Sequence, residues 1–507
     1  MTEGTPAELT RGAVLARNAV WNIIGQGVPL LAALVAIPVT LRGLGTERFG
    51  ALSLAWLLIG YFSLFDLGLG RALTKLVAEK LAGRRDEEIP ALAWTALFLM
   101  LGLGVAGALL ITLPSTWLVE RALRIPPALQ DETRQALYVL GASVPFVIST
   151  AGLRGLLEAK QRFGLVNAVR IPMGVFTFVG PILVLPFSRS LVAVVGLLAF
   201  GRLVGWAVHV ALCLRVFPAL RHGLALHPPL MAPLLRLGGW MTVTNVVGPL
   251  MVYLDRFLIG GLMSLAAVAY YATPYEMVTK LLVVPSAVAQ VLFPAFAASL
   301  VVDRPRAGLL FDRGVKTVFL SLFPPTLLLV ALAPELLRLW LGTEFARESA
   351  RVLQWLAVGV FINGLAQIPF ALVQGAGRPE FTARLHLVEL PFYLVAVWWL
   401  IRARGVEGAA IAWTARAAVD AAVLLLMAAR TVPAPPGARW RAASLVTGLA
   451  VCVLGSLWDT LLAKALFLAA TLAAFAVLSW FFILTTDERL SARSCFARTA
   501  APPRAQP

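Results

Sequence analysis

Residues 89–113 read IPALAWTALFLMLGLGVAGALLITL, a stretch of 25 residues without a charged side chain. A helix needs about 20 apolar residues to cross the hydrocarbon core of a bilayer, so this stretch predicts a transmembrane helix. Thirteen further apolar segments have the same character. They are 17–41, 49–72, 136–157, 164–187, 191–214, 237–262, 268–300, 317–341, 352–374, 382–401, 407–429, 442–458 and 465–484. The segment 268–300 contains Pro274, Pro285 and Pro294, and we expect it to be tilted or broken.

The composition of the whole chain predicts the same class of protein. Of its 507 residues, 60% are hydrophobic and 14% are charged, whereas typical proteins have roughly 45–50% and 25%. A soluble enzyme of this size could not cover its surface with so few polar groups, and intrinsic disorder requires low hydrophobicity. We therefore expect an all-α polytopic membrane protein with about 14 transmembrane helices.

The formal net charge of +17 also fits a membrane protein. In a soluble protein it would suggest nucleic acid as a partner, but basic residues accumulate in cytoplasmic loops, where they face anionic lipid. We therefore expect contact with membrane lipids and no nucleic acid. The three cysteines and four histidines show no metal-site spacing, so we expect no metal and no cofactor beyond a coupling H⁺ or Na⁺.

The distribution of basic residues predicts the topology. If the N-terminus is cytoplasmic, 25 of the 43 Lys and Arg residues lie on the inside, 12 lie outside and six lie within helices. Because Lys and Arg concentrate on the cytoplasmic side of membrane proteins, both termini are expected in the cytoplasm. The segments 114–135 and 342–351 are then expected to be outside loops.

A weak internal repeat predicts two halves. Trp21 and Trp240 are 219 residues apart, and Arg202 and Arg416 are 214 residues apart. Halves with six helices each would be parallel repeats around an axis along the membrane normal. The expected parts are a cytoplasmic tail (1–16), an N-terminal lobe (17–218), a cytoplasmic linker (219–236), a C-terminal lobe (237–431), two further helices (432–484) and a cytoplasmic tail (485–507).

Signatures of catalysis are missing from the sequence. It contains no Gly-x-x-x-x-Gly-Lys-Ser/Thr phosphate loop, which argues against ATP hydrolysis, and it has no serine nucleophile motif. No expected outside loop is large enough for the active site of a polymerase. We therefore expect a transporter and no enzyme, with a membrane-embedded polymerase or ligase as the remaining alternative from another class.

Four motifs, in this order, resemble those of the bacterial polysaccharide flippases. These Wzx-type proteins act in O-antigen and exopolysaccharide pathways and belong to the multidrug/oligosaccharidyl-lipid/polysaccharide exporter superfamily. The motifs are residues 65–75 (FDLGLGRALTK), 240–260 (WMTVTNVVGPLMVYLDRFLIG), 374–379 (QGAGRP) and 405–410 (GVEGAA).

The resemblance implies a V-shaped fold with two lobes around a central cavity. It implies alternating access for a polyprenyl-diphosphate-linked oligosaccharide in the cytoplasmic (inner) membrane, for surface polysaccharides such as lipopolysaccharide. A polysaccharide polymerase and a chain-length regulator are the implied protein partners. A lipid II flippase and a multidrug exporter of the same superfamily remain open. Drug exporters favour cationic compounds and acidic cavities, whereas the helices here hold six basic and about five acidic groups.

Charged side chains inside helices are the candidate substrate ligands, because each costs about 2.5–3.5 kcal/mol at the bilayer centre. Arg202 has no acidic residue three or four positions away on its helix. Arginine presents a fork of donors that suits phosphate and carboxylate, and aromatic rings can stack on sugar faces. Ion pairing within the membrane and snorkelling are the structural alternatives. The candidate substrate-binding residues are Arg202, Arg416, Arg256, Lys280, Asp255, Tyr253 and Tyr275.

Two further groups of polar residues are candidates for coupling and gating. His386 and Glu389 share a helix face, and such a pair could carry a coupling proton, although a simple polar contact between helices would also explain it. Glu276 and Asp420 are further coupling candidates. Glycines permit close packing and backbone adjustment, so the stretch around Asp66, at the end of the second expected helix, is interpreted as a cytoplasmic gate, with a helix C-cap as the alternative. The gate candidates are Asp66, Gly68, Gly70 and Arg71.

Overall fold

The computed structural model describes most of the chain. The described residues are 12–44, 52, 66–122, 127–222, 224–263, 265–433, 440–458, 460–484 and 489. Within these residues every regular element is a helix, and ten helical spans are long and apolar enough to cross a membrane. The expected all-α membrane fold is confirmed. The segment 49–72 lies largely outside the described residues, and the number fourteen stays a prediction.

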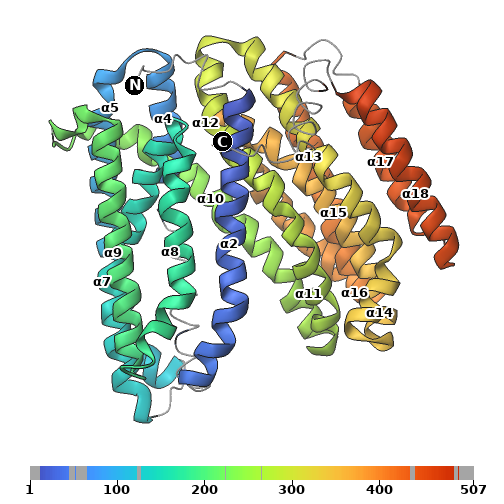
Figure 1. The fold of residues 1–507 in the computed structure, drawn as a ribbon, viewed down its shortest axis with the longest axis horizontal. Helices are drawn as coiled ribbons and strands as arrows, with labels where there is room; N and C mark the ends of the chain where they lie inside the picture. Colours follow the sequence, from blue (N-terminus) through green and yellow to red (C-terminus); the bar gives the residue numbers. More distant parts are fainter. Residues whose placement is uncertain are drawn as a thin grey trace, which may run out of the picture. The chain divides into compact units, whose positions relative to one another are not determined.

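Figure 1 shows the order and direction of the helices. The α-helices are α2 (Gly12–Leu44), α4 (Leu69–Ala82), α5 (Ile89–Thr112), α6 (Ser115–Trp117), α7 (Pro127–Ala159), α8 (Phe163–Val184), α9 (Leu191–Val216), α10 (Pro228–Leu262), α11 (Leu265–Thr279), α12 (Val283–Val302), α13 (Arg304–Ala331), α14 (Ala333–Leu341), α15 (Thr343–Gly375), α16 (Pro379–Thr431), α17 (Trp440–Gly455) and α18 (Leu461–Leu478). Short 3₁₀ or π segments are η1 (Asp86–Glu88), η2 (Leu118–Ala122), η3 (Pro218–Arg221), η4 (Lys280–Leu282) and η5 (Ser479–Ile483).

Two helix breaks agree with the sequence. The apolar segment 268–300 is interrupted by η4, which separates α11 from α12. The segments 382–401 and 407–429 both belong to α16, which is kinked at Gly405 with φ 61° and ψ −140°. This positive φ favours glycine, because a side chain would be strained there.

Helices extend well beyond several apolar segments. Helix α7 begins inside the expected outside loop 114–135, and α10 begins at Pro228, inside the expected linker 219–236. The range 73–88, which lies between the expected transmembrane segments 49–72 and 89–113, contains most of α4, which packs against α7 and buries even Lys75. Apolar windows locate only the part of a helix that lies in hydrocarbon, whereas backbone hydrogen bonds continue through its polar ends. Helix α10 thus covers the second part of the expected linker, and the linker itself stays a prediction.

The chain forms two compact units. The first comprises Met1–Val252, Ser286–Ala307 and Pro369–Leu390, and the second comprises Tyr253–Pro285, Gly308–Ile368 and Pro391–Pro507. The lobes expected at 17–218 and 237–431 stay a prediction.

In the first unit, α7 packs between α5 and α9, while α8 packs against α2 and α9 (Figure 1). Gly104 permits the close approach of α5 to α7, because a Cβ atom there would lie 2.3 Å from the Cα atom of Pro145. A buried polar link also joins segments far apart in the sequence. The Gln161 side chain accepts a hydrogen bond from Asn18 at 3.1 Å and donates one to the Val291 carbonyl at 3.2 Å. Such buried amides must be satisfied, so they fix the packing of the elements they join.

In the second unit, the last two helices pack against α13 through aromatic rings. The rings of Phe323 and Phe475 lie 4.7 Å apart, and Phe319 contacts both of them. Gly448 in α17 faces the same two α13 phenylalanines, and Lys464 in α18 forms a 2.7 Å ion pair with Glu335 in α14. Helices α17 and α18 are thus attached to this unit by specific contacts.

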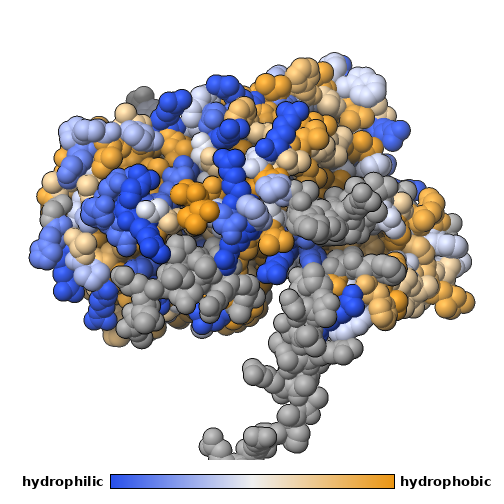
Figure 2. Space-filling model, turned by 90° about the horizontal axis from the view of Figure 1, so that it is seen from above, coloured by the Kyte–Doolittle hydropathy of each residue, from blue (hydrophilic) through white to orange (hydrophobic). Residues whose placement is uncertain are grey.

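The ends of the helices are more polar than their middles. Figure 2 shows the molecule from above, where many hydrophilic residues are exposed among apolar ones. The connection between α4 and α5 is one such polar segment, with exposed Arg84, Arg85 and Glu87 and a partly exposed Glu88. Polar helix ends are expected where helices leave the hydrocarbon core.

Candidate functional site

The first group of functional candidates lies in a pocket of the first unit. Arg202, in the middle of α9, lines a cavity of about 380 Å³ between α7, α8 and α9. Its Nη1 atom is buried without a hydrogen-bond partner among the described residues. Arg154 of α7 and Arg170 of α8 line the same cavity. The structure therefore brings Arg202 together with two arginines that were not among the expected substrate ligands.

The four gate candidates lie together where α4 begins. The Asp66 carboxylate accepts hydrogen bonds from the backbone N–H groups of Gly68 at 2.9 Å and Gly70 at 3.0 Å. Gly68 has φ 65°, and a Cβ atom there would lie 2.6 Å from the Gly238 carbonyl oxygen. Arg71 donates a 3.4 Å hydrogen bond to Gln374. Asp66 therefore caps the start of α4, and the gating role stays a prediction.

The second unit gathers a different set of candidates around Asp255. This carboxylate is fully buried and accepts hydrogen bonds from the hydroxyl groups of Tyr271 and, at 3.5 Å, Tyr393. It also accepts a 2.7 Å hydrogen bond from the backbone N–H of Arg256. A buried carboxylate is tolerated when such donors replace water, so Asp255 is satisfied within its own unit.

Ion pairs and rings surround Arg256 in the same unit. Arg256 pairs with Glu276 at 3.1 Å, and its guanidinium lies 5.1 Å from the centre of the Tyr275 ring. Lys280 forms an ion pair at 3.3 Å with Glu276, which precedes it by one helical turn. The positive charges of this region are therefore compensated by Glu276 and by the ring face of Tyr275. The Tyr253 side chain lies outside the described residues.

Arg416 joins this region through aromatic side chains. Its guanidinium lies 5.6 Å from the centre of the Tyr393 ring. The Tyr275 ring packs edge-on against Trp413 at 5.6 Å, and it stacks on Tyr271 at 6.1 Å. We call Asp255, Tyr271, Tyr275, Tyr393 and Trp413, together with Arg256 and Arg416, the aromatic cluster of the second unit.

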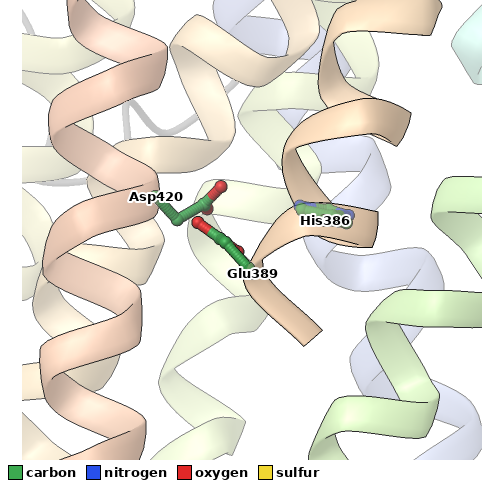
Figure 3. Close-up of side chains that lie close together, drawn as sticks. All are labelled: His386, Glu389 and Asp420. Carbon is green, nitrogen blue, oxygen red and sulfur yellow. The ribbon is translucent and has the colours of Figure 1, made fainter. Parts of the chain in front are cut away.

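His386 and Glu389 lie one turn apart in the first part of α16, and both are buried. Figure 3 draws them together with Asp420, which lies beyond the Gly405 kink and is also buried. The His386 ring stacks on Phe370 at 6.2 Å. The shared face of His386 and Glu389 follows from their spacing of three residues. Their role in coupling stays a prediction.

Several residues of these regions were not singled out from the sequence. Tyr393 and Trp413 reach Asp255 and Tyr275 from more than 130 positions along the chain, and no local motif marks them. Trp206 and His209 line the pocket of Arg202. Their spacing from Arg202 by four and seven residues is a helical-face signal that could have identified them.

Ten long apolar helical spans with buried charges define a multi-pass membrane protein. Residues 15–300 match the family described as "Polysaccharide biosynthesis protein", and the chain belongs to this family. The resemblance seen in the sequence motifs is thereby confirmed.

Similar proteins support both the family and the fold. A Shigella flexneri protein named "Putative O-antigen transporter" is 30% identical over 423 residues, which cover 80% of this chain and 96% of that protein. A mutant MATE transporter from Vibrio cholerae superposes with a TM-score of 0.68 at 16% identity, covering 85% of this chain and 98% of its own. A MOP superfamily transporter from Pyrococcus furiosus superposes with a TM-score of 0.68 at 18% identity. The match covers 88% of this chain and 100% of that protein. These structures show that the chain has the fold of MATE and MOP transporters.

Proposed function

We propose that the protein is a flippase that moves polyprenyl-diphosphate-linked oligosaccharide across the bacterial inner membrane for surface polysaccharide biosynthesis. The observation that carries this proposal is the 30% identity, across 96% of its length, to a protein named as an O-antigen transporter. Transport by alternating access, with no chemical step, agrees with the MATE-like fold. The likeness to multidrug transporters is below 20% identity and extends to the fold alone.

Charged and aromatic side chains are proposed to contact the substrate. In the first unit the proposed substrate ligand is Arg202. In the second unit the substrate ligands are Arg256, Arg416, Lys280, Asp255, Tyr275 and Tyr253. The proposal is supported by the cost of placing charges inside a membrane protein and by the suitability of arginine for phosphate and acidic sugars. His386, Glu389, Glu276 and Asp420 are proposed to couple transport to H⁺ or Na⁺, and Asp66, Gly68, Gly70 and Arg71 to form the cytoplasmic gate.

The proposed orientation places both termini in the cytoplasm, although most of both tails lies outside the described residues. A polysaccharide polymerase and a chain-length regulator are the proposed protein partners. Residues near Arg124, also outside the described residues, are expected to be labelled from the periplasm in single-cysteine variants. Labelling of this segment from the cytoplasm would contradict the proposed orientation.

A deletion strain tests the function. We expect loss of the surface polysaccharide, accumulation of lipid-linked repeat units that remain inaccessible from the periplasm, and recovery of both when the wild-type gene is returned. Normal polysaccharide together with increased drug sensitivity would support an exporter instead. Accumulation of the cell-wall precursor lipid II with cell lysis would support a lipid II flippase.

A further inference from the structure

The pocket between α7, α8 and α9 lies within the first unit. All of its lining residues lie between Val147 and His209. Its volume of about 380 Å³ falls within the range of small-molecule sites, which is roughly 300–1,000 Å³. Apolar side chains, among them Met173, Phe176 and Leu198, form much of the wall. Among the described residues, only those of the first unit line the cavity.

Positive charge dominates this cavity. Arg154, Arg170 and Arg202 line it, and no acidic side chain is found among its described lining residues. Arg154 forms a 3.3 Å ion pair with Glu158, which lies outside the lining. Neither Arg170 nor Arg202 forms an ion pair with any described residue. Arg170 also interacts electrostatically with Glu158, so one described carboxylate serves two of the three arginines, and none acts on Arg202. This excess of positive charge beside apolar walls favours an anionic ligand, because charge in such surroundings is costly until it is paired.

Hydrogen-bonding atoms without a partner point to the same ligand class. Nη1 of Arg202, Nε1 of Trp206 and Nε2 of His209 are all buried, and none has a partner among the described residues. The three side chains follow one another at spacings of four and three residues, so they share one face of α9, and all three line the cavity. Buried polar atoms are normally satisfied, so a run of three in one cavity is unusual.

The chemistry of these atoms restricts what can fill the site. The guanidinium and indole N–H groups can only donate hydrogen bonds. The Nδ1 atom of His209 lies 2.8 Å from the Gly205 carbonyl oxygen, so Nδ1–H donates to this oxygen, and Nε2 of the neutral ring accepts from an O–H group of the ligand. A ligand that satisfies the donors must present several acceptor oxygens and negative charge. A cationic drug would offer neither, and a neutral sugar would leave the guanidinium charges uncompensated.

A phosphate group meets these requirements better than a carboxylate. Its oxygens are arranged as a tetrahedron, so they can accept from guanidinium groups on three different helices, whereas the two oxygens of a carboxylate lie in one plane. We propose that the pocket lined by Arg154, Arg170, Arg202, Trp206 and His209 binds the phosphate-bearing head group of the lipid-linked substrate. This inference rests on the proposed function and assigns the recognition of phosphate to the first unit alone.

The test measures binding directly, by native mass spectrometry of the purified full-length protein in detergent. The probe is geranyl diphosphate, with geraniol as the uncharged analogue and phosphatidylglycerol as a membrane phospholipid. We expect geranyl diphosphate to bind the wild type, geraniol to bind weakly, and phosphatidylglycerol to compete poorly. Equal binding of geraniol, or of phosphatidylglycerol, would overturn the assignment to the substrate head group.

Three variants locate the site. Arg202→Gln is expected to weaken binding of geranyl diphosphate by about ten-fold or more, because a hydrogen bond to a charged group is lost. Trp206→Phe keeps the ring packed against Phe146 and removes only the N–H, so a loss of about three- to ten-fold is expected. Arg215→Gln is the matched control, since Arg215 lies exposed on the same helix outside the pocket, and its binding should equal that of the wild type.

The outcomes separate this inference from the proposed function. Unchanged binding in a folded Arg202→Gln protein would overturn the pocket, even if polysaccharide export depended on the gene. Conversely, binding that requires Arg202 and Trp206, in a protein whose deletion leaves the polysaccharide unaffected, would retain the phosphate pocket and overturn the flippase. A thermal unfolding midpoint measured for each variant shows whether it is folded.

Discussion

The pocket of the first unit and the aromatic cluster of the second unit both contain arginine and aromatic side chains, but they differ in whether the arginine charges have partners. Arg202 has a buried Nη1 atom without a partner among the described residues. Arg256, in contrast, forms an ion pair with Glu276 and contacts the Tyr275 ring. A charge that is already compensated has a structural role beside any contact with substrate, because removing it leaves its partners without theirs. A charge that is not compensated is available to a ligand. The two regions are therefore expected to respond differently to substitution.

The largest effect is expected for Arg202. Arg202→Ala should abolish most of the polysaccharide export, while the protein remains at normal abundance in the membrane, because no described side chain depends on this guanidinium. Arg202→Lys should recover only part of the activity, since lysine retains the charge and loses the forked donor geometry. A complementation assay, run beside an immunoblot of membrane fractions, measures both. Low abundance of Arg202→Ala would make Arg202 a structural residue, and full activity would remove it from the mechanism.

A second large effect is expected at His386 and Glu389, the proposed coupling pair, which belongs neither to the pocket nor to the aromatic cluster. Glu389→Gln should abolish the dependence of transport on a pH gradient, because glutamine cannot exchange a proton, and insertion should be unaffected. Transport into vesicles with and without an imposed gradient measures this dependence. Transport by Glu389→Gln at the wild-type rate, with the same response to the gradient, would exclude Glu389 from coupling.

A moderate effect on stability is expected from the aromatic cluster. Asp255→Ala leaves the Tyr271 hydroxyl without its buried acceptor, so the free energy of unfolding should fall by about 1–3 kcal/mol. The thermal unfolding midpoint in detergent measures the change. Asp131→Ala is the control, because the Asp131 side chain is 79% exposed and surface ion pairs contribute little. Equal midpoints for the two variants would remove the contrast between the two regions.

The smallest effect is expected at the glycine-rich start of α4. A Cβ atom at Gly70 would lie 2.7 Å from the Asp66 carboxylate and 3.2 Å from the Ala151 carbonyl oxygen. Gly70→Ala should therefore destabilise the protein by about 1–2 kcal/mol through local overpacking. Gly164→Ala in α8 is the matched control, since nothing lies within 4 Å of its Cβ position. A Gly70→Ala protein as stable as this control would show that the segment adjusts freely.

The amino-acid sequence was sufficient for the class of protein, for most helices and for the family. Long uncharged segments such as 89–113 indicate spanning helices because the bilayer core excludes unpaired polar groups. The break near residue 280 and the kink at Gly405 were also predictable, since proline and glycine act on the local backbone. Arg202 could be selected because the absence of an acidic neighbour on its own helix is visible in the sequence.

Contacts between distant segments depend on the tertiary structure. The sequence alone could not show that Arg154 and Arg170 share a cavity with Arg202, or that Tyr393 donates a hydrogen bond to Asp255 across 138 positions. It also placed most of α4 in a loop, because hydropathy detects contact with lipid and α4 is buried against protein. A sequence pattern indicates the environment of one helix. Whether a charge on that helix has a partner depends on the side chains of the helices that pack against it. That physical difference separates the unpaired arginine of the pocket from the paired arginine of the aromatic cluster.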